Sequence, residues 1–174
     1  MSESKRRSSR GRVLEICLIP LMATIIFASK WVMQSLPNIE PVSFFIIIFS
    51  LTFKIRVVLP AVYIYVFLEF ATQPSGIWMI PYLYVWGILC IFTYLCKGIK
   101  NVHFWSVASA VFGFMFGLFC TIPTFIIGGW TLGVTWWTSG IYFDILHFFG
   151  NFVIMRWLYT PMINAMQKIN NFLK

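Results

Sequence analysis

Six apolar runs constrain this chain more than any other feature of its sequence. They cover residues 13–33, 42–53, 57–71, 78–96, 104–127 and 134–159. About 20 apolar residues, folded as a helix, cross the hydrocarbon of a bilayer. Only 10% of the residues are charged, whereas about a quarter are charged in a soluble domain. Because so little polar surface cannot cover a globule in water, the sequence predicts an all-α integral membrane protein.

Polar, proline-containing or glycine-rich segments separate these runs, which favours helices joined by short turns. The main breaks are QSLPNIEP at 34–41, TQPSG at 72–76, KGIKN at 97–101 and GGWTLG at 128–133. The runs 42–53 and 57–71 are short for a full crossing and could instead form a re-entrant hairpin. In that hairpin Lys54 and Arg56 would lie in the middle of the membrane, at a cost of several kcal/mol each.

The basic residues favour six crossings over the hairpin. With the N-terminus inside, all of the thirteen lysines and arginines except Lys30 fall on one side of the membrane. Cytoplasmic segments carry such an excess of Lys and Arg. We therefore predict six transmembrane helices with both termini in the cytoplasm. The net charge of +8 then reflects orientation, and nothing indicates a nucleic-acid partner.

Three parts of the chain follow from this arrangement. Residues 1–12, MSESKRRSSRGR, are predicted to be a disordered basic cytoplasmic tail. Residues 13–160 form the six-helix transmembrane domain. Residues 161–174 are predicted to be an amphipathic cytoplasmic tail, helical on the membrane surface. The four cysteines lie within or at the ends of apolar runs, where they are interpreted as small buried hydrophobes and not as a disulfide framework.

One apolar stretch carries three polar side chains in register. SGIYFDILHFFGN, at 139–151, contains Asp144, His147 and Asn151, which share one face of a helix at spacings of three and seven. An ionisable residue inside a span is costly and faces a cavity or a partner. Two interpretations stay open: the three side chains form the polar floor of a ligand pocket, or they are a structural bridge between helices.

Aromatic residues gather in the half of the membrane opposite the basic residues. Trp78, Tyr82 and Trp86 are spaced by four and line one helical face. Tryptophans mark both interfaces of most membrane proteins, but aromatic walls with a few polar groups also make a ligand site. No nucleophile elbow, H-E-x-x-H, P-loop or dinucleotide motif occurs. We expect no enzyme activity, no cofactor and no metal; the alternative is an intramembrane enzyme that uses Asp144 and His147 as an acid–base pair.

The chain resembles the S components of energy-coupling-factor (ECF) vitamin importers over residues 13–160. The resemblance rests on six short spans, a basic tail, L-P-N-I-E-P after the first span and G-I-x-F-D-I-L-H-x-x-G-N-F in the last. It implies a capture subunit of the bacterial cell membrane that binds a vitamin near the outer face. It also implies association with a transmembrane coupling subunit and two cytosolic ATPases.

The resemblance also implies site residues, carried over by position. For ligand binding they are Asn38, Glu40, Trp78, Tyr82, Trp86, Trp130, Trp136, Tyr142, Asp144, His147 and Asn151. The family docks its coupling subunit on small residues of the first span, often Ala-x-x-x-Ala. This sequence lacks that pattern and offers Pro20, Ala23, Thr24 and Ala28 instead.

The whole chain looks most similar to the cobalamin-type S components. Its predicted outer half holds almost no cations apart from Lys30. This disfavours folate or pyridoxal phosphate as the ligand, because proteins bind carboxylate and phosphate groups with Arg or Lys. Cobalamin and related corrinoids are therefore the expected ligand. Pyridoxine or another small neutral vitamin precursor is the alternative.

Overall fold

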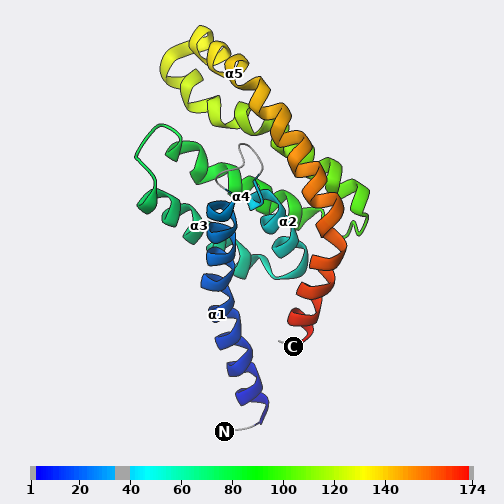
Figure 1. Ribbon diagram of the computed structural model, residues 1–174. Coiled ribbons are helices and arrows are strands. Elements are labelled where there is room, and N and C mark those ends of the chain that lie inside the picture. Colours follow the sequence, from blue (N-terminus) through cyan, green and yellow to red (C-terminus); the bar gives the residue numbers. More distant parts are fainter. Residues whose placement is uncertain (1–2, 34–39, 173–174) are drawn as a thin grey trace.

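The computed structural model describes residues 3–33 and 40–172, and in this part of the chain all regular structure is helical (Figure 1). The elements are α1 (Glu3–Val32), α2 (Val42–Thr52), α3 (Ile55–Thr72), α4 (Met79–Leu95) and α5 (Val102–Phe172). Three of them, α1, α3 and α5, are long and apolar enough to cross a membrane. The predicted all-α class is confirmed, and the helices are compatible with a membrane protein.

The longest helix, α5, folds back on itself at Gly129. This residue has φ 73° and ψ −176°, a backbone conformation that glycine adopts without the steric cost of a Cβ. The break divides α5 into two arms, 102–128 and 130–172, which run in opposite directions (Figure 1). The glycine-rich break predicted at 128–133 is therefore confirmed, and each of the six apolar runs lies in a helical segment of its own.

Ion pairs join α1 to α3 near both ends of their contact. Lys30 pairs with Glu69 at one end. At the other end Glu15 binds Lys54 at 2.7 Å and Arg56 at 2.8 Å. Glu15 and Lys30 are separated by about 22 Å along a helix, at 1.5 Å per residue. The turn between α2 and α3 thus lies at the end of the bundle opposite Lys30, which argues against the hairpin with mid-membrane cations.

The shortest helix, α2, is a core helix. Its 11 residues extend about 16 Å, too little to cross the hydrocarbon alone. Ile46, Ile47 and Ile48 are successive residues that point in different directions, and all three are fully buried. A helix that is apolar all round is a buried one. The helix is short because its neighbours, not lipid, surround it.

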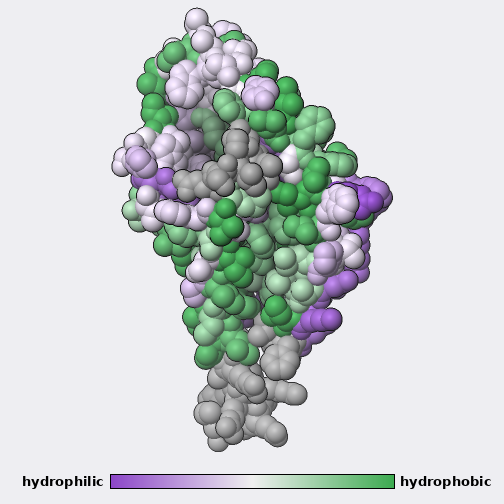
Figure 2. Space-filling view, in the orientation of Figure 1, coloured by the Kyte–Doolittle hydropathy of each residue, from purple (hydrophilic) through white to green (hydrophobic). Residues whose placement is uncertain are grey.

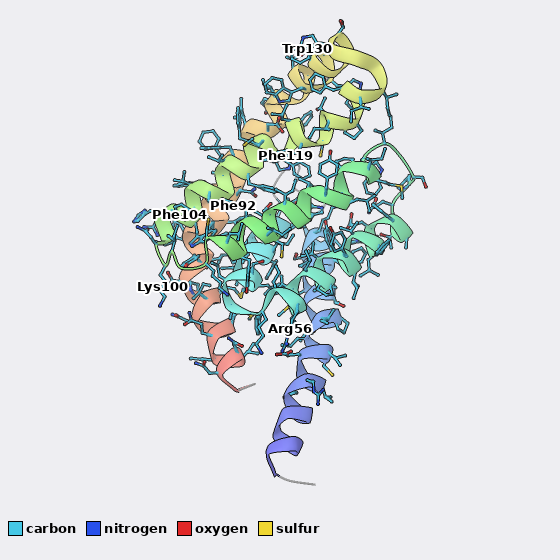
Figure 3. The ribbon with its side chains drawn as sticks, turned by 180° about the vertical axis from the view of Figure 1, so that it is seen from behind. Arg56, Phe92, Lys100, Phe104, Phe119 and Trp130 are labelled. Atoms are coloured by element: carbon cyan, nitrogen blue, oxygen red, sulfur yellow. The ribbon has the colours of Figure 1, made fainter. Side chains whose placement is uncertain are left out.

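The outside of the bundle is apolar. Val32, Ile126 and Trp157 are each more than three-quarters exposed, and most of the visible surface in Figure 2 is coloured hydrophobic. Soluble monomers rarely expose apolar side chains so continuously. In Figure 3, Trp130 lies at the upper tip of the molecule, and Arg56 and Lys100 lie well away from it, near mid-height. An apolar surface with cations away from one tip is compatible with a membrane protein.

The N-terminal tail differs from expectation, whereas the C-terminal tail is helical as expected. The stretch 1–12 was expected to be disordered, but α1 begins at Glu3, because lysine and arginine are good helix formers and extending an existing helix needs no new nucleus. The C-terminal stretch is helical over 161–172 and continues α5 without a boundary. Asn170 donates a hydrogen bond to the carbonyl of Thr52 at 2.9 Å, so this end contacts the end of α2; that it lies on the membrane surface stays a prediction.

Substituting Gly113 should separate the two arms of α5. A Cβ there would lie 2.7 Å from Asn151 Nδ2 and 2.8 Å from the carbonyl oxygen of His147, and the backbone atom cannot move aside. We expect Gly113→Ala to destabilise the protein by about 1–3 kcal/mol, measured as a lower thermal unfolding midpoint in detergent. Gly140→Ala is the control, because nothing lies within 4 Å of its Cβ position; equal midpoints for the two variants would contradict the packing.

Candidate functional site

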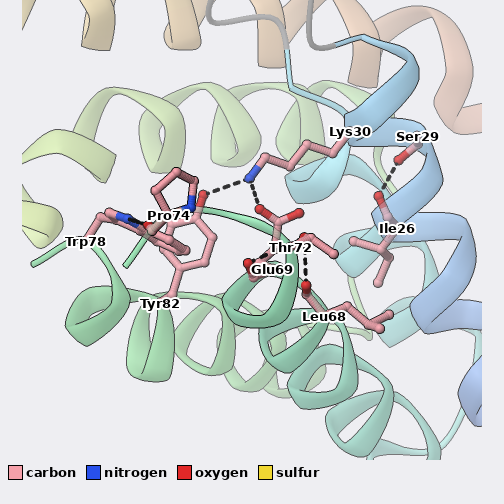
Figure 4. Close-up of polar contacts among 9 residues, drawn as sticks. All are labelled: Ile26, Ser29, Lys30, Leu68, Glu69, Thr72, Pro74, Trp78 and Tyr82. Atoms are coloured by element: carbon pink, nitrogen blue, oxygen red, sulfur yellow. Dashed lines mark hydrogen bonds and ion pairs between the residues drawn. The ribbon is translucent and has the colours of Figure 1, made fainter. Parts of the chain in front are cut away.

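A buried ion pair joins three helices at one end of the bundle. Lys30, in the last turn of α1, pairs with Glu69 of α3 and donates a hydrogen bond to the hydroxyl of Tyr82 on α4 at 3.2 Å (Figure 4). The ammonium also lies 5.2 Å from the centre of the Tyr82 ring. Glu69 is 0% exposed. A buried carboxylate requires such a partner, since an isolated charge in a low-dielectric interior is very costly.

Other buried polar atoms around this pair lack hydrogen-bond partners. Within the part of the chain that the structure describes, Glu69 Oε1, Glu40 Oε1 and Trp86 Nε1 are buried and unbonded. Buried polar groups are nearly always hydrogen-bonded, so these atoms mark a place that water or a ligand would fill. We refer to the group as the Lys30 cluster, which comprises Lys30, Glu40, Tyr65, Glu69, Tyr82 and Trp86.

One member of the cluster titrates in the physiological range. Burial raises the pKa of Glu40, in the connection before α2, to about 7; Lys30 lowers this pKa and Glu69 raises it. The carboxyl therefore exchanges its proton near neutral pH. The cluster can hold either one or two acidic charges beside its single ammonium.

An aromatic wall extends from the cluster along α4. Trp78, Tyr82 and Trp86 follow one another edge to face, with ring centres 5.1 and 5.6 Å apart, and Trp86 packs on Phe116 of α5 at 5.2 Å. Edge-to-face packing is a favoured geometry for aromatic pairs. The prediction that these three residues share one face of α4 is confirmed.

A cavity of about 490 Å³ adjoins this wall. It lies between the start of α4 and the two arms of α5, where Trp78, Trp136 and Trp137 meet Cys120 and Thr121. The volume falls in the range of about 300–1,000 Å³ that small-molecule sites have. Trp78 belongs both to the wall and to the cavity, so the cavity and the Lys30 cluster are neighbours.

The polar ladder of the last helix faces the other arm of α5. Asp144 Oδ1 accepts a hydrogen bond from the Gly117 N–H at 3.0 Å, and Asn151 donates one to the Ser109 carbonyl at 3.2 Å. Of the two interpretations, the bridge between helices fits these bonds. Asp144 does not line the cavity, although Gly117, to which it is bonded, does.

The third member of the ladder, His147, packs on the ring of Phe116 at 5.7 Å. Its Nδ1 atom is buried and unbonded among the described residues. No hydrogen bond joins it to Asp144 in that part of the structure, so the two side chains are not arranged as an acid–base pair.

The remaining candidates for ligand binding are scattered. Trp136 lines the cavity. Trp130 stacks on Phe125 at the tip of α5 and is 78% exposed, and Tyr142 is 65% exposed; neither contacts the Lys30 cluster. Asn38 lies outside the residues that the structure describes.

The docking candidates on α1 divide between two faces. Pro20, Thr24 and Ala28 are exposed and lie at successive four-residue steps along one side of the helix. Ala23 is fully buried in the bundle. The exposed small-residue stripe therefore comprises three of the four residues named from the sequence.

Sequence reasoning left three residues of the cluster out of the site: Lys30, Tyr65 and Glu69. A signal for two of them was present, because Lys30 and Glu69 are opposite charges near the same ends of two apolar runs. An ionisable residue within a span indicates that a partner of opposite charge lies nearby, as well as a possible site. Tyr65 carried no comparable signal.

Comparison with known proteins gives no match: no protein-family model, no curated protein and no solved structure is similar to this chain. No group of three or more His, Cys, Asp or Glu side chains suited to a metal ion occurs in the described part of the chain. The cluster, the wall and the cavity are therefore the features that bear on function.

Removing the Lys30 side chain should destabilise the protein strongly. Lys30→Met leaves the Glu69 carboxylate buried without its cation, which costs about 3 kcal/mol, and the thermal midpoint in detergent should fall accordingly. The double variant Lys30→Met/Glu69→Gln should recover most of the loss. Lys54→Met is the control, because the Lys54–Glu15 pair is exposed and contributes less than about 1 kcal/mol; a loss as large for Lys54→Met would contradict the assignment.

Glu40 should make stability depend on pH. Its carboxyl has a pKa of about 7 in the folded state and 4.5 in the unfolded state, so the folded protein binds the extra proton between these values. Stability should fall as pH rises from about 4.5 to 7 and then level off. Glu40→Gln removes this dependence, and its thermal midpoint relative to wild type should be higher at pH 8 than at pH 5. Parallel pH profiles for the two proteins would count against the buried carboxyl.

Proposed function

We propose that this chain is the substrate-capture (S) subunit of an ECF-type importer. In this proposal it binds a vitamin at the outer face and delivers it through an ATP-driven module. The observation that carries the proposal is the set of unbonded buried atoms on Glu40, Glu69 and Trp86, in a cluster that Trp78 connects to a cavity of about 490 Å³. Concave apolar walls with a few convergent polar groups are the mark of a small-molecule site.

The proposed topology is six crossings with both termini in the cytoplasm of a bacterial cell, in which α2 crosses within the bundle and local thinning of the bilayer accommodates its short length. Two observations support it: the α2–α3 turn lies at the end opposite Lys30, and Arg56 and Lys100 lie away from the tip that carries Trp130 (Figure 3). The Lys30 cluster then opens to the outside, where a capture subunit meets its solute.

The hydrogen-bonding groups of the cluster favour some vitamins over others as the ligand. Glu40 and Glu69 each offer a free acceptor oxygen and Trp86 offers a donor, while Lys30 is already paired with Glu69. Among the described residues of the cluster there is no second cation to hold a carboxylate or phosphate. The cluster therefore suits a ligand rich in amide N–H and hydroxyl groups, and the amide-bearing rim of cobalamin and related corrinoids meets that requirement.

Pyridoxine or another small neutral precursor is the second candidate, and the size of the cavity favours it. A volume of about 490 Å³ holds a drug-sized ligand whole. A corrinoid is larger, so it would place part of its rim in the cavity and leave the remainder outside.

The proposed partners are a transmembrane coupling subunit and two cytosolic ATPases. The exposed stripe of Pro20, Thr24 and Ala28 on α1 is the proposed docking face, because small side chains let helices approach closely in lipid. We propose no catalytic role. The acid–base alternative has little support, since Asp144 is bonded to the Gly117 backbone and not to His147.

Ligand binding tests the proposal directly. Purified protein titrated calorimetrically should bind either cobalamin or pyridoxine at nanomolar to micromolar concentration and return it unchanged. Trp86→Phe keeps the ring but removes the N–H donor, and should weaken binding about tenfold, the equivalent of one lost hydrogen bond. Trp157→Phe is the matched control, because Trp157 is 77% exposed on the outer surface of the bundle.

Three results would overturn the proposal. No measurable binding of any vitamin in a full panel would indicate a structural subunit. Conversion of a ligand to product would indicate an enzyme. Binding that Trp86→Phe and Trp157→Phe leave equally unchanged would place the site elsewhere.

A further inference from the structure

A second cavity lies at the end of the bundle opposite the Lys30 cluster. It has a volume of about 520 Å³ and is formed by α1, the α2–α3 turn, the α4–α5 turn and the end of α5. Its lining comprises Glu15, Leu18, Leu51, Thr52, Phe53, Lys54, Val57, Lys97, Gly98 and Asn170. Four separate parts of the chain thus converge on one space, and the proposed vitamin site uses none of these residues.

The cavity carries an excess of positive charge. Lys54 and Lys97 line it, and Arg56 lies beside it on the same Glu15 carboxylate that binds Lys54. Glu15 is the one acid of the lining, and it pairs with Lys54 and Arg56, which leaves Lys97 unneutralised. The Lys97 ammonium lies 4.0 Å from the centre of the Tyr94 ring and has no ion-pair partner among the described residues.

The start of α3 adds hydrogen-bond donors to the same place. Lys54 is the N-cap residue of α3, and its side chain makes no capping bond. The first backbone N–H groups of a helix have no partner within the helix and favour an anion. The start of α3 and the two lysines Lys54 and Lys97 border this space, and helix starts and lysines both bind oxyanions.

The cavity also has apolar walls beside its charged groups. Leu18, Leu51, Phe53 and Val57 line it alongside the lysines. A free phosphate ion would gain nothing from these side chains, whereas the glycerol and acyl carbons of a lipid would pack on them. Basic pockets between membrane helices bind acidic lipid headgroups in this way.

We propose that this cavity binds the phosphate group of an anionic phospholipid. The phosphodiester lies against Lys97, Lys54 and the start of α3, and the lipid chains leave along Leu18 and Val57. A lipid held there joins α1, α3 and the end of α5, which approach one another at this cavity. The proposal does not depend on the vitamin ligand or on the identity of the transported solute.

Lipid binding to the full chain in detergent tests this proposal. Phosphatidylglycerol should raise the thermal midpoint, and native mass spectrometry should show it retained. Phosphatidylcholine and inorganic phosphate at the same concentration should do neither. Lys97→Gln should weaken phosphatidylglycerol binding about fivefold, the contribution of one cation near an acidic lipid.

Lys100→Gln is the matched control. Lys100 is exposed, lies three residues beyond Lys97 and does not line the cavity, so it changes the same net charge without touching the site. Equal binding of phosphatidylglycerol and phosphatidylcholine would overturn the proposal, as would equal losses for Lys97→Gln and Lys100→Gln. An effect of inorganic phosphate as large as that of the lipid would identify a soluble anion as the occupant instead. Because Lys97 makes no ion pair, both variants should fold, and unchanged midpoints without lipid would show this.

Discussion

The attachment of α1 to α3 at both ends is the constraint on which the rest of the bundle depends. Opposite charges attract far more strongly in a low-dielectric interior than in water, and Lys30 with Glu69 makes such a pair where Glu69 is fully buried. The exposed Glu15 pairs add little energy but fix the register at the far end. Beside these two aligned helices, α2 packs mainly on α5 and α4, with its isoleucines and phenylalanines buried between them.

A second constraint is the close approach of the two arms of α5. Gly113 and Gly117 leave room for the side chains of Asn151 and Asp144, which then bond to the backbone of the facing arm. A polar group in an apolar bundle needs a partner, and backbone atoms between small residues provide one. The polar side chains of the second arm therefore hold the two arms of α5 together, and Gly117, which donates its N–H to Asp144, also lines the cavity.

Much of the architecture could be predicted from the sequence, because apolar length, turn residues and four-residue spacing are local signals. The six runs became helical segments, the break at 128–133 became the turn at Gly129, and Trp78, Tyr82 and Trp86 share a face. The helical state of residues 3–12 was not predicted, since a basic composition is equally compatible with disorder when the helix that extends it is not considered.

The site was harder to predict because it depends on tertiary register. Spacing places Asp144, His147 and Asn151 on one face but does not say which helix that face meets. Likewise Trp130 and Tyr142 belong to the same runs as Trp136, yet only Trp136 reaches the cavity. The pairing of Lys30 with Glu69 joins residues 39 positions apart, and no local pattern encodes it.

The two ends of the bundle have opposite chemistry, and this difference follows from how cations are distributed. At one end Lys30 is paired with Glu69, so the unbonded carboxyl oxygens there, on Glu40 and Glu69, are acceptors. At the other end Lys54 and Arg56 share Glu15 and Lys97 has no ion-pair partner among the described residues, so the second cavity is bordered by donors. The excess of Lys and Arg that sets the orientation of membrane helices therefore also divides the molecule into an end that suits hydrogen-bond donors and an end that suits anions. A neutral or amide-rich solute and an acidic lipid would not compete for the same place.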